Sequence, residues 1–519
     1  MLPAICFIYS RKNVEKFANE ITTTLIDSHT INKIQKECRH ILTKFDNYKE
    51  YLNLPEYSMI VKLLEKGIAI HHAGLLPVFR EMIELLFTKG YIKFLFATET
   101  FAVGLNMPTK TVIFSELQKF DGYSKRNLYS HEYTQQAGRA GRRGFDTVGR
   151  VIHLTNIFDL PDIQDYKLLL SNKSQEFISK FKISYNLILH LLSNNTNDNP
   201  FEVVHNSIII KDINKEIDYI SNKIASIEAC IQKQQHIIDN GCQIPVLEIK
   251  EMIELENTIS MYKNKHRKQK QRQIDDFKYT NRHYEKEKII HNTFDEYIKE
   301  KEHQQQQLEN TQNYISYQIN SIKSILSSNN FIDNNNLTET GKKTIALKET
   351  HSLVLVDVLE KFNNFDDFTV DQIISYLSCF TNINVADDIK IRNPYSNNDL
   401  VQSVLTYTQN RMEYYYNEEI KHNIYSGANY EIQYNIIDDM HDWCGCSTET
   451  ESISFLNALK NEKGIFIGEF TKAILKINNI KNELAKLCIT FNHLELLSKL
   501  EQIPEKILKF VCTPQSLYV

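Results

Sequence analysis

A central segment, residues 213–326, limits the possible folds of this 519-residue chain more than any other part of the sequence. Its first part places isoleucine at alternating spacings of four and three residues, which is the pattern of a coiled-coil seam; these are Ile213, Ile217, Ile220, Ile224, Ile227 and Ile231. A second seam follows at Leu308, Ile315, Ile319, Ile322 and Leu326. No glycine lies between Gly241 and Gly341. The pattern predicts an antiparallel stalk of two long helices whose seams bury each other.

A basic run lies between the two seams, near the expected tip of the stalk. Residues 263–272 read KNKHRKQKQR and contain six Lys or Arg. Such runs are most often the solvated face of a helix, and the alternative is a contact with RNA or with a partner protein. The sequence leaves both interpretations open.

Residues 1–155 alternate short apolar runs with helical patterns, which predicts a parallel, doubly wound α/β sheet. We expect five strands, within residues 5–9, 67–74, 91–98, 111–114 and 150–154, and an amphipathic helix over 77–89. This part carries 21 basic and 15 acidic residues, a net charge of +6, whereas the remainder carries 39 basic and 50 acidic residues. A basic domain on an acidic body suits an anionic ligand.

The rest of the chain is predicted to be mostly helical. Residues 156–212 have a mixed, helical pattern, and residues 328–344 are rich in turn-forming residues, as a short β-wing would be. Residues 350–519 are again helical.

The nine cysteines do not predict a metal site. Their only close pair is Cys444 and Cys446, and a zinc site usually needs two such pairs. Scattered cysteines of this kind are typical of reduced thiols in an intracellular protein, cytoplasmic or nuclear. We find no signal-peptide pattern and no apolar run long enough to cross a membrane.

The segment HEYTQQAGRAGRRGFD at 131–146 is the strongest indication of function. It packs three glycines and three arginines into the seven residues 138–144. Glycine lets the backbone approach an anion closely, and arginine offers forked donors that fit phosphate oxygens. The alternative is a loose RGG-like loop, which is usually repetitive and of low complexity; this segment is single and opens from a helix.

A second segment, LFATETFAVGLNMPTKTVIF at 95–114, reads as strand, polar turn, glycine and strand. Thr98 and Glu99 stand at the carboxyl end of the first strand, where open α/β sheets bind ligands. An ordinary connection between two strands remains the alternative.

Taken in order, FIYSRKNVE, AIHHAGL, FATETFAVGLNMP, KFDG and QQAGRAGRRGFD resemble motifs IV to VI of superfamily-two helicases. The chain resembles most the superkiller-like, exosome-associated DExH-box RNA helicases. Arg143 supports this family, because related DNA-repair and spliceosomal helicases usually have proline there. Later segments, among them 181–192, 368–380 and the last residues KILKFVCTPQSLYV, resemble the family's winged helix and helical bundle.

The resemblance implies a RecA-like lobe over 1–155 followed by mostly helical parts. A winged helix would consist of 156–212 and 327–349, interrupted by the coiled-coil stalk at 213–326, and a DSHCT-like ratchet bundle would occupy 350–519. The family's stalk carries a β-barrel tip, which needs turns containing glycine. We therefore expect this glycine-free insert to lack the barrel.

The resemblance also implies ATP-driven 3′-to-5′ unwinding of RNA, with ATP and Mg²⁺ as cofactors. Gln135, Arg139 and Arg142 would act at the γ-phosphate, with Arg142 as the arginine finger. Nucleotide would be bound by Asn106, Gly138, Arg139 and Arg142. RNA would contact Ser10, Arg11, Gly74, Thr98 and Gly104, together with Glu469 and Lys472 of the expected ratchet helix at 464–480.

One part of the family pattern is missing from this sequence. It contains no GxxxxGK[ST] phosphate loop and no DExH box, so we expect residues 1–519 alone to be inactive and to need a first RecA-like lobe, in cis or in trans. An exosome-like nuclease complex is a further expected partner, and a membrane is not. Two rivals stay open, a non-catalytic RNA-binding or scaffold protein and a fragment of a DNA-repair helicase.

Overall fold

The computed structural model describes residues 1–104, 107, 109–122, 124–142, 144, 146–171, 179–194 and 201–518. The chain divides into two compact units. The first is Met1–Phe177, Glu339–Ile420 and Ala428–Val519, and the second is Ile178–Thr338 and Lys421–Gly427.

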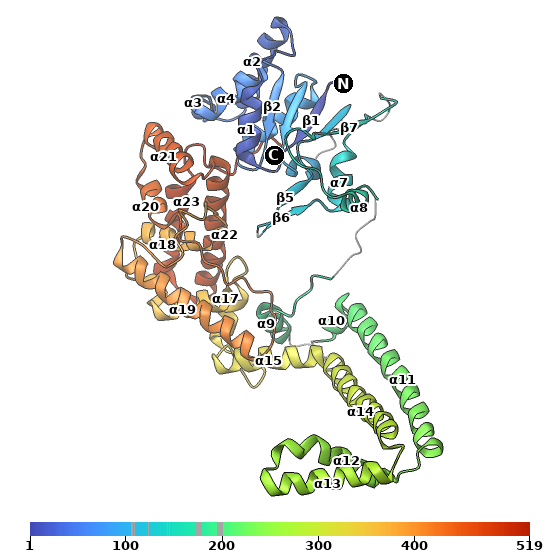
Figure 1. The fold of residues 1–519 in the computed structure, drawn as a ribbon. Coiled ribbons are helices and arrows are strands. Elements are labelled where there is room, and N and C mark those ends of the chain that lie inside the picture. The colour runs from blue at the N-terminus through green and yellow to red at the C-terminus, as the bar shows by residue number, and fades with distance from the viewer. Residues whose placement is uncertain are drawn as a thin grey trace. The chain divides into compact units, whose positions relative to one another are not determined.

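The N-terminal part of the first unit is an α/β lobe built on a parallel sheet (Figure 1). Its strands are β1 (Ala4–Phe7), β2 (Ile68–His71), β3 (Phe94–Ala97), β4 (Thr111–Phe114) and β7 (Arg150–His153). Their order across the sheet is β2-β3-β1-β4-β7, and every pair is parallel. The five strands predicted from the apolar runs are therefore all present.

Helices pack against this sheet through their apolar faces. They are α1 (Arg11–Glu20), α2 (Ser28–Leu42), α3 (Tyr48–Asn53), α4 (Pro55–Leu64), α5 (Pro77–Thr88), α6 (Thr100–Gly104), α7 (Ser130–Ala137) and α8 (Ile163–Leu170). The amphipathic helix predicted over 77–89 is α5, which buries Phe79, Met82, Ile83 and Leu86, whereas Leu85 is only half-buried. The sequence did not predict the antiparallel hairpin β5 (Gln118–Phe120) and β6 (Lys125–Asn127), whose strands are mostly polar.

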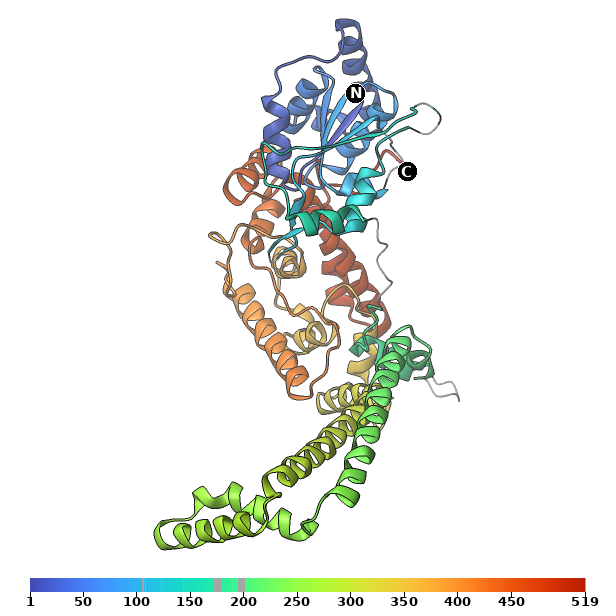
Figure 2. The same ribbon diagram turned by 45° about the vertical axis from the view of Figure 1, so that its right-hand side comes forward.

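The second unit contains a long helical arm (Figures 1 and 2). Helix α11 (Ile209–Gly241) packs along α14 (Tyr284–Gln312). The pair is antiparallel, because Lys223 pairs with Glu300 near one end, at 3.4 Å, and Gln234 donates to the Ile290 carbonyl further along, at 3.0 Å. No strand lies between residues 209 and 331, all of which are described, so no β-barrel interrupts the arm.

The predicted pairing of the two seams is wrong in its second half. Residues 315–326 form a separate helix, α15 (Tyr314–Ser328), which packs on α9 (Tyr185–Ser193) and on strand β8 (Ile332–Asp333). The face that α14 buries instead includes Glu287, His291 and Gln304. A search for apolar repeats misses such a face, because long polar side chains form much of it.

At the far end of the arm, α12 (Val246–Thr258) and α13 (Asn264–Thr280) form a short helical pair. A small core of Ile244, Ile249, Ile253 and Tyr284 holds it to the start of α14. The Glu287 carboxylate accepts from the backbone amides of Gln243 and Ile244, at 3.0 Å each, and so fixes the link that leaves α11.

The second unit also contains the short α10 (Glu202–His205) and a hairpin of β8 with β9 (Asn336–Leu337), as the turn-rich sequence predicts. The C-terminal part of the first unit is helical. Its helices are α16 (Glu339–Ile345), α17 (Ser352–Lys361), α18 (Val370–Leu377), α19 (Asp399–Lys421), α20 (Ile437–Gly445), α21 (Glu449–Lys463), α22 (Ile467–Phe491) and α23 (Leu494–Ile507). None of the helices in the described part of the chain is long and apolar enough to cross a membrane.

The start of α22 lies directly on the α/β lobe. The Gly468 amide donates to the Gly74 carbonyl at 2.9 Å, and an added Cβ on Gly468 would lie 2.2 Å from the Leu75 carbonyl oxygen. A Cβ on Gly74 would lie 2.8 Å from the Phe466 ring. The two glycines therefore permit a close contact between the lobe and the helical part of the same unit.

Candidate nucleotide and RNA site

The carboxyl edge of the parallel sheet brings two predicted segments together. Strands β1 and β3 are parallel neighbours, and their last paired residues are Phe7 and Ala97. Ser10 and Thr98 follow these two strand ends, so both lie at the carboxyl edge of the sheet. The Ser10 hydroxyl caps α1 by accepting from the Asn13 amide at 3.4 Å. The Thr98 hydroxyl lies 2.9 Å from that of Thr100, the first residue of α6.

The loop after α7 is bound through its backbone to the chain that enters β4. The Thr109 amide donates to the Arg139 carbonyl at 2.8 Å, and the Gly141 amide donates to the Thr109 carbonyl at 2.6 Å. Gly141 adopts a φ of +94°, and a Cβ on Gly149 would lie 2.4 Å from the Ala140 carbonyl oxygen. Glycine is thus needed for the conformation of the arginine-bearing loop.

Arg139 and Gln135 occupy different surroundings on this segment. The Arg139 guanidinium donates to the Ala102 carbonyl of α6, and burial lowers the pKa of Arg139. Gln135 is exposed on α7, and Gly138, which ends that helix, is exposed as well. Arg139 therefore ties the loop to α6, and Gln135 presents its amide to solvent.

Arg142 is held by a two-pronged ion pair with Asp146. Its Nε lies 2.7 Å from Asp146 Oδ2, and its Nη2 lies 3.0 Å from Oδ1. The Arg142 amide also donates to Oδ2, at 3.1 Å. The hydrogen bonds from Arg142 lower the pKa of the Asp146 carboxyl to about 2. The bonds to Asp146 thus use the forked donors with which an arginine would bind a phosphate.

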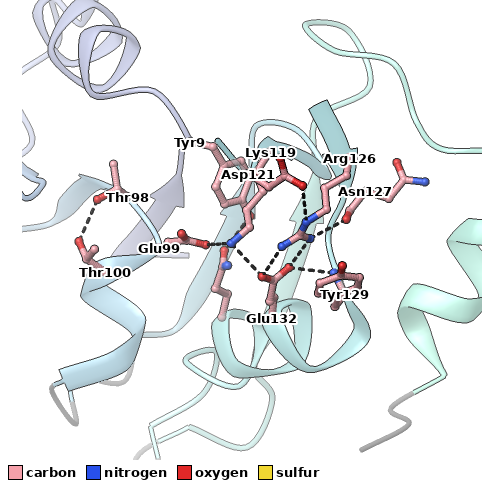
Figure 3. Close-up of polar contacts among 11 residues, drawn as sticks. Tyr9, Thr98, Glu99, Thr100, Lys119, Asp121, Arg126, Asn127, Tyr129 and Glu132 are labelled. Carbon is pink, nitrogen blue, oxygen red and sulfur yellow. Dashed lines mark hydrogen bonds and ion pairs between the residues drawn. The ribbon is translucent and has the colours of Figure 1, made fainter. Parts of the chain in front are cut away.

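A polar network holds the β5–β6 hairpin to α7 (Figure 3). At its centre, the Glu132 carboxylate accepts from Lys119 at 2.8 Å, from both terminal nitrogens of Arg126 at 2.9 Å, and from the Tyr129 amide at 2.9 Å. Lys119 also contacts Glu99 at 2.7 Å. The network therefore links the turn after β3 with the helix that carries the glycine–arginine loop.

The charges in this network stabilise one another. Burial alone would raise the pKa of Glu132, but the hydrogen bonds from Arg126, Lys119 and the Tyr129 amide outweigh burial and lower that pKa to about 2. Burial would lower the pKa of Lys119, yet its bonds to Glu132 and Glu99 raise it. Nearby, the Tyr9 hydroxyl donates to Gln136 at 2.8 Å and joins the end of β1 to α7.

A groove of about 490 Å³ lies between α1 and α22. Its lining includes Arg11, Glu469 and Lys472, together with Asn382 and Lys476. The Arg11 guanidinium pairs with the Glu469 carboxylate, which also accepts from the Phe466 amide at 3.3 Å and so caps α22. Burial and the neighbouring Arg80 and Arg11 lower the pKa of Lys472. Three cationic side chains line this groove, and two of them have carboxylate partners, Arg11 with Glu469 and Lys476 with Glu349.

The predicted site residues fall into three places. The first place is α7 and its loop, which carry Gln135, Gly138, Arg139 and Arg142. The second is the groove, which is lined by Arg11, Glu469 and Lys472. Ser10, Thr98 and Gly104 lie near the sheet edge, and Gly74 is buried beneath Phe466. Asn106 lies outside the described residues.

Sequence reasoning missed the Lys119–Glu132–Arg126 network. KFDG resembles a family segment but does not by itself indicate a partner for Lys119, and the sequence motifs assign no role to Glu132. One signal was available, because Glu132 is the only acidic residue among residues 122–145, a strongly basic stretch. An isolated carboxylate in such a stretch often has cationic partners.

Two protein families match separate parts of the chain. A helicase conserved C-terminal domain matches residues 43–144, and a DSHCT (NUC185) domain matches residues 334–514. The chain is a relative of the superkiller-like DExH-box RNA helicases. The antiviral helicase SKI2 of Saccharomyces cerevisiae is 43% identical over 193 residues, which are 37% of this chain and 15% of that relative.

Two further relatives have similar coverage. The human exosome RNA helicase MTR4 is 42% identical over 195 residues, which are 37% of this chain and 18% of that protein. The Arabidopsis thaliana helicase DExH10 is 39% identical over 232 residues, 44% of this chain and 22% of the relative. The aligned part is thus under a quarter of each of these DExH-box relatives.

Proposed function

We propose that this chain supplies the second motor lobe and the C-terminal bundle of an ATP-dependent, 3′-to-5′ RNA helicase that acts in RNA decay. The observation that carries the proposal is the glycine–arginine loop, which the backbone of Thr109 fixes where the chain enters β4, at the amino edge of the sheet. In two-lobe motors, arginines at this place stabilise charge on the transferring γ-phosphate. Arg142 is our choice for the arginine finger, with Arg139 and Gln135 beside it.

ATP and Mg²⁺ would need ligands that this sequence does not contain. The described residues include no group of three His, Cys, Asp or Glu side chains that could hold a metal ion, and residues 1–519 contain no phosphate loop. When bound, Mg²⁺ neutralises charge on the phosphates. The arginine side chains fit the phosphate end of a nucleotide, and the metal ligands would come from a first RecA-like lobe, in cis or in trans. Asn106 stays our candidate for the ribose contact.

For RNA, we propose the groove between α1 and α22 as the main contact of this chain. Arg11 and Lys472 would bind the phosphate backbone, and Ser10, Thr98 and Gly104 would follow its path along the lobe. Gly74 was expected to contact RNA as well, but it is buried beneath Phe466 and its carbonyl accepts from Gly468, so it is not part of this proposal. Glu469 orients Arg11 and caps α22, so its carboxylate acts on RNA mainly through that arginine.

The domain boundaries given above are part of the same proposal. We assign residues 1–155 to the motor lobe and 350–519 to the ratchet bundle. A winged helix made of 156–212 and 327–349 is supported by the packing of α15 on α9 and β8, and of α9 on β9. The helix pair α11–α14 would then be a coiled-coil stalk inserted into it. An exosome-like nuclease complex is the partner we expect.

The test is ATP hydrolysis by purified residues 1–519 with saturating RNA, with and without a separate polypeptide that carries a phosphate loop and a DExH box. We expect no turnover by the chain alone, because phosphoryl transfer also needs a phosphate cradle and a metal site. Turnover should appear with the added lobe and should require Arg142. Robust turnover by the chain alone, abolished by Arg142→Ala, would reveal an ATP site that we have not identified.

One observation favours a second candidate, a non-catalytic RNA-binding protein derived from a helicase. Asp146 already accepts from two donor groups of Arg142, Nε and Nη2, so this arginine has a partner within its own loop. Under this alternative, RNA binding would be unaffected by ATP even when the first lobe is supplied. Comparing RNA and DNA affinity in the same experiment would also separate both proposals from a DNA-repair helicase.

A further inference from the structure

A second groove, of about 300 Å³, lies in the helical part of the first unit, between α19 and residues 430–434. Its lining is mostly apolar and aromatic, and it includes Met412, Tyr416, Tyr430, Ile432 and Tyr434. None of the residues proposed above to contact ATP or RNA lies in this groove. It is therefore a separate feature, and its chemistry has to be read from its own side chains.

Two tyrosine rings border the groove at a steep angle to each other. The ring centroids of Tyr416 and Tyr430 are 5.5 Å apart, and the ring planes meet at 65°. Tyr430 is held in place, because its hydroxyl donates to Glu419 at 2.7 Å and the His351 ring packs 5.0 Å from its own. Tyr416, in contrast, is 51% exposed. The protein thus keeps a large aromatic ring at the surface beside a second ring that is fixed.

The charged side chains of the groove are mainly acidic. Glu413 and Glu431 line it and are exposed, and within the described residues neither forms an ion pair. The Gln409 amide donates to Glu413 at 2.8 Å, which orients that carboxylate. The one cation of the lining, Arg392, has Asp387 as its own partner, at 3.9 Å. The groove therefore has an excess of negative charge, and its electrostatic complement is a cation.

The same helix already holds one arginine with this combination of groups. The Arg411 guanidinium lies 4.5 Å from the ring centroid of Tyr414 and 4.8 Å from that of Tyr415, and it pairs with Asp357 at 2.7 Å. A cation over aromatic faces gains from the ring quadrupole, and the carboxylate neutralises its charge. Within the described residues, no cation lies over the Tyr416 ring. The groove thus offers tyrosines and carboxylates with the place of the arginine left to another molecule.

We propose that this groove binds an arginine side chain presented by an exposed segment of a partner protein. Its guanidinium would stack on Tyr416 beside Tyr430 and pair with Glu413 or Glu431, while its methylene groups would contact Met412. Arginine fits better than lysine, because the guanidinium is planar, stacks on aromatic rings and is more weakly hydrated than an ammonium group. The site needs neither ATP nor RNA, so it is independent of the motor assignment.

The experiment measures binding of short peptides to the full chain by saturation-transfer NMR, which detects weak ligands. The probe is a capped pentapeptide with one arginine between glycine and serine residues, and matched peptides carry citrulline or lysine in its place. Citrulline keeps the shape of arginine and removes the charge, so its peptide should bind about tenfold more weakly or not at all. The lysine peptide should bind about threefold more weakly than the arginine peptide, because an ammonium group cannot stack.

Variants of the chain locate the binding. Tyr416→Ala should weaken binding of the arginine peptide by about fivefold, whereas Tyr416→Phe, which keeps the ring, should bind like the wild type. Tyr395→Ala is the matched control, because Tyr395 is also an exposed tyrosine of this unit, at 54%, and does not line the groove. Tyr416 is half exposed, so its removal leaves the core of the bundle unchanged.

The carboxylates are tested in the same way. Glu413→Gln/Glu431→Gln should weaken binding by about tenfold, and Glu462→Gln/Glu501→Gln, which neutralises two exposed glutamates of α21 and α23, should not. Equal binding of the arginine and citrulline peptides would overturn the proposal, and so would undetectable binding or equal losses in the groove variants and their controls. A proline-rich peptide that binds through Tyr416 while the arginine peptide does not would also overturn it, by showing an apolar docking site.

Discussion

The Arg11 guanidinium pairs with the Glu469 carboxylate, although 458 positions separate the two residues in the sequence. The pair joins the first helix of the α/β lobe to the first turn of α22. Both side chains line the groove that also contains Lys472. The surface that we propose for RNA is therefore built jointly by the lobe and the helical part of the same unit.

Removing the cations of this groove should weaken RNA binding. We expect Arg11→Gln and Lys472→Gln each to lower the affinity for single-stranded RNA by about fivefold at low salt, the effect of one lost phosphate contact. Glu469→Gln should change the affinity less than either cation variant does, because the loss of the partner that orients Arg11 is offset by the loss of a negative charge from the groove. Anisotropy titrations check these values, with Lys486→Gln, an exposed position further along α22, as the control. Unchanged affinity in both cation variants would exclude the groove.

The outline of the fold was predictable because its signals are local. Four of the five parallel strands are short apolar runs that are mostly buried, and the edge strand β7 carries the apolar pair Val151 and Ile152. The glycine–arginine loop was equally visible, since its chemistry is contained in seven adjacent residues. The β5–β6 hairpin was not predicted, because Lys119, Lys125 and Arg126 make its strands polar and its stability depends on Glu132, a residue of a different element.

The pairing within the arm and the groove depends on contacts that a repeat pattern cannot specify. The isoleucine seam of α11 correctly predicted a long helix, but its partner helix buries Glu287 and Gln304, and the second apolar seam packs elsewhere. Likewise, Arg11 and Lys472 were each predicted to bind RNA, whereas nothing local indicated that Glu469 would bind Arg11. Long-range partners of charged residues follow from the tertiary fold.

Arg142 provides the sharpest test of the motor assignment. With a complementary lobe present, Arg142→Ala should lower ATP turnover by about 10³-fold, the scale of an arginine finger, and should change nucleotide affinity far less. Arg150→Ala is the matched control, since Arg150 is an exposed arginine on the edge strand β7. Steady-state ATPase kinetics check the prediction. If ATP turnover by Arg142→Ala stays within a few-fold of wild type, Arg142 is not the arginine finger, and its role is the ion pair with Asp146.

The contact between the lobe and α22 should be sensitive to a single methyl group. Gly468→Ala would place a Cβ 2.2 Å from the Leu75 carbonyl oxygen, which belongs to the backbone and cannot rotate away. We expect a loss of about 1–3 kcal/mol in stability, as for overpacking elsewhere, and faster tryptic cleavage between the lobe and α22. Gly445→Ala, where an added Cβ meets no atom within 4 Å, is the control. Equal unfolding temperatures for Gly468→Ala and Gly445→Ala would contradict the close contact.

The Glu132 network should make the α/β lobe sensitive to acid. The pKa of Glu132 is about 2 in the folded lobe, below its ordinary value of 4.5. The ionised carboxylate's contribution to the stability of the lobe is therefore fully present above pH 4.5, and it is lost as the pH falls from there towards 2. Glu132→Gln removes the charge, leaving Lys119 and Arg126 without their shared partner. After allowance for solvent screening, we expect a loss of about 2 kcal/mol at pH 7.

The measurement is thermal unfolding followed by circular dichroism from pH 7 to pH 3, for the wild type and for Glu132→Gln. Protonation of the wild-type carboxylate reproduces the variant, so the two unfolding temperatures should differ most at pH 7 and approach each other as the pH falls below 4.5. Glu451→Gln is the control, because Glu451 also has a lowered pKa but caps α21 at an exposed position away from the lobe's network. A difference between wild type and Glu132→Gln that stays constant with pH would show that shape, and not charge, explains the role of Glu132. In that case the hairpin would be held to α7 by packing, and the bonds from Lys119 and Arg126 would contribute little.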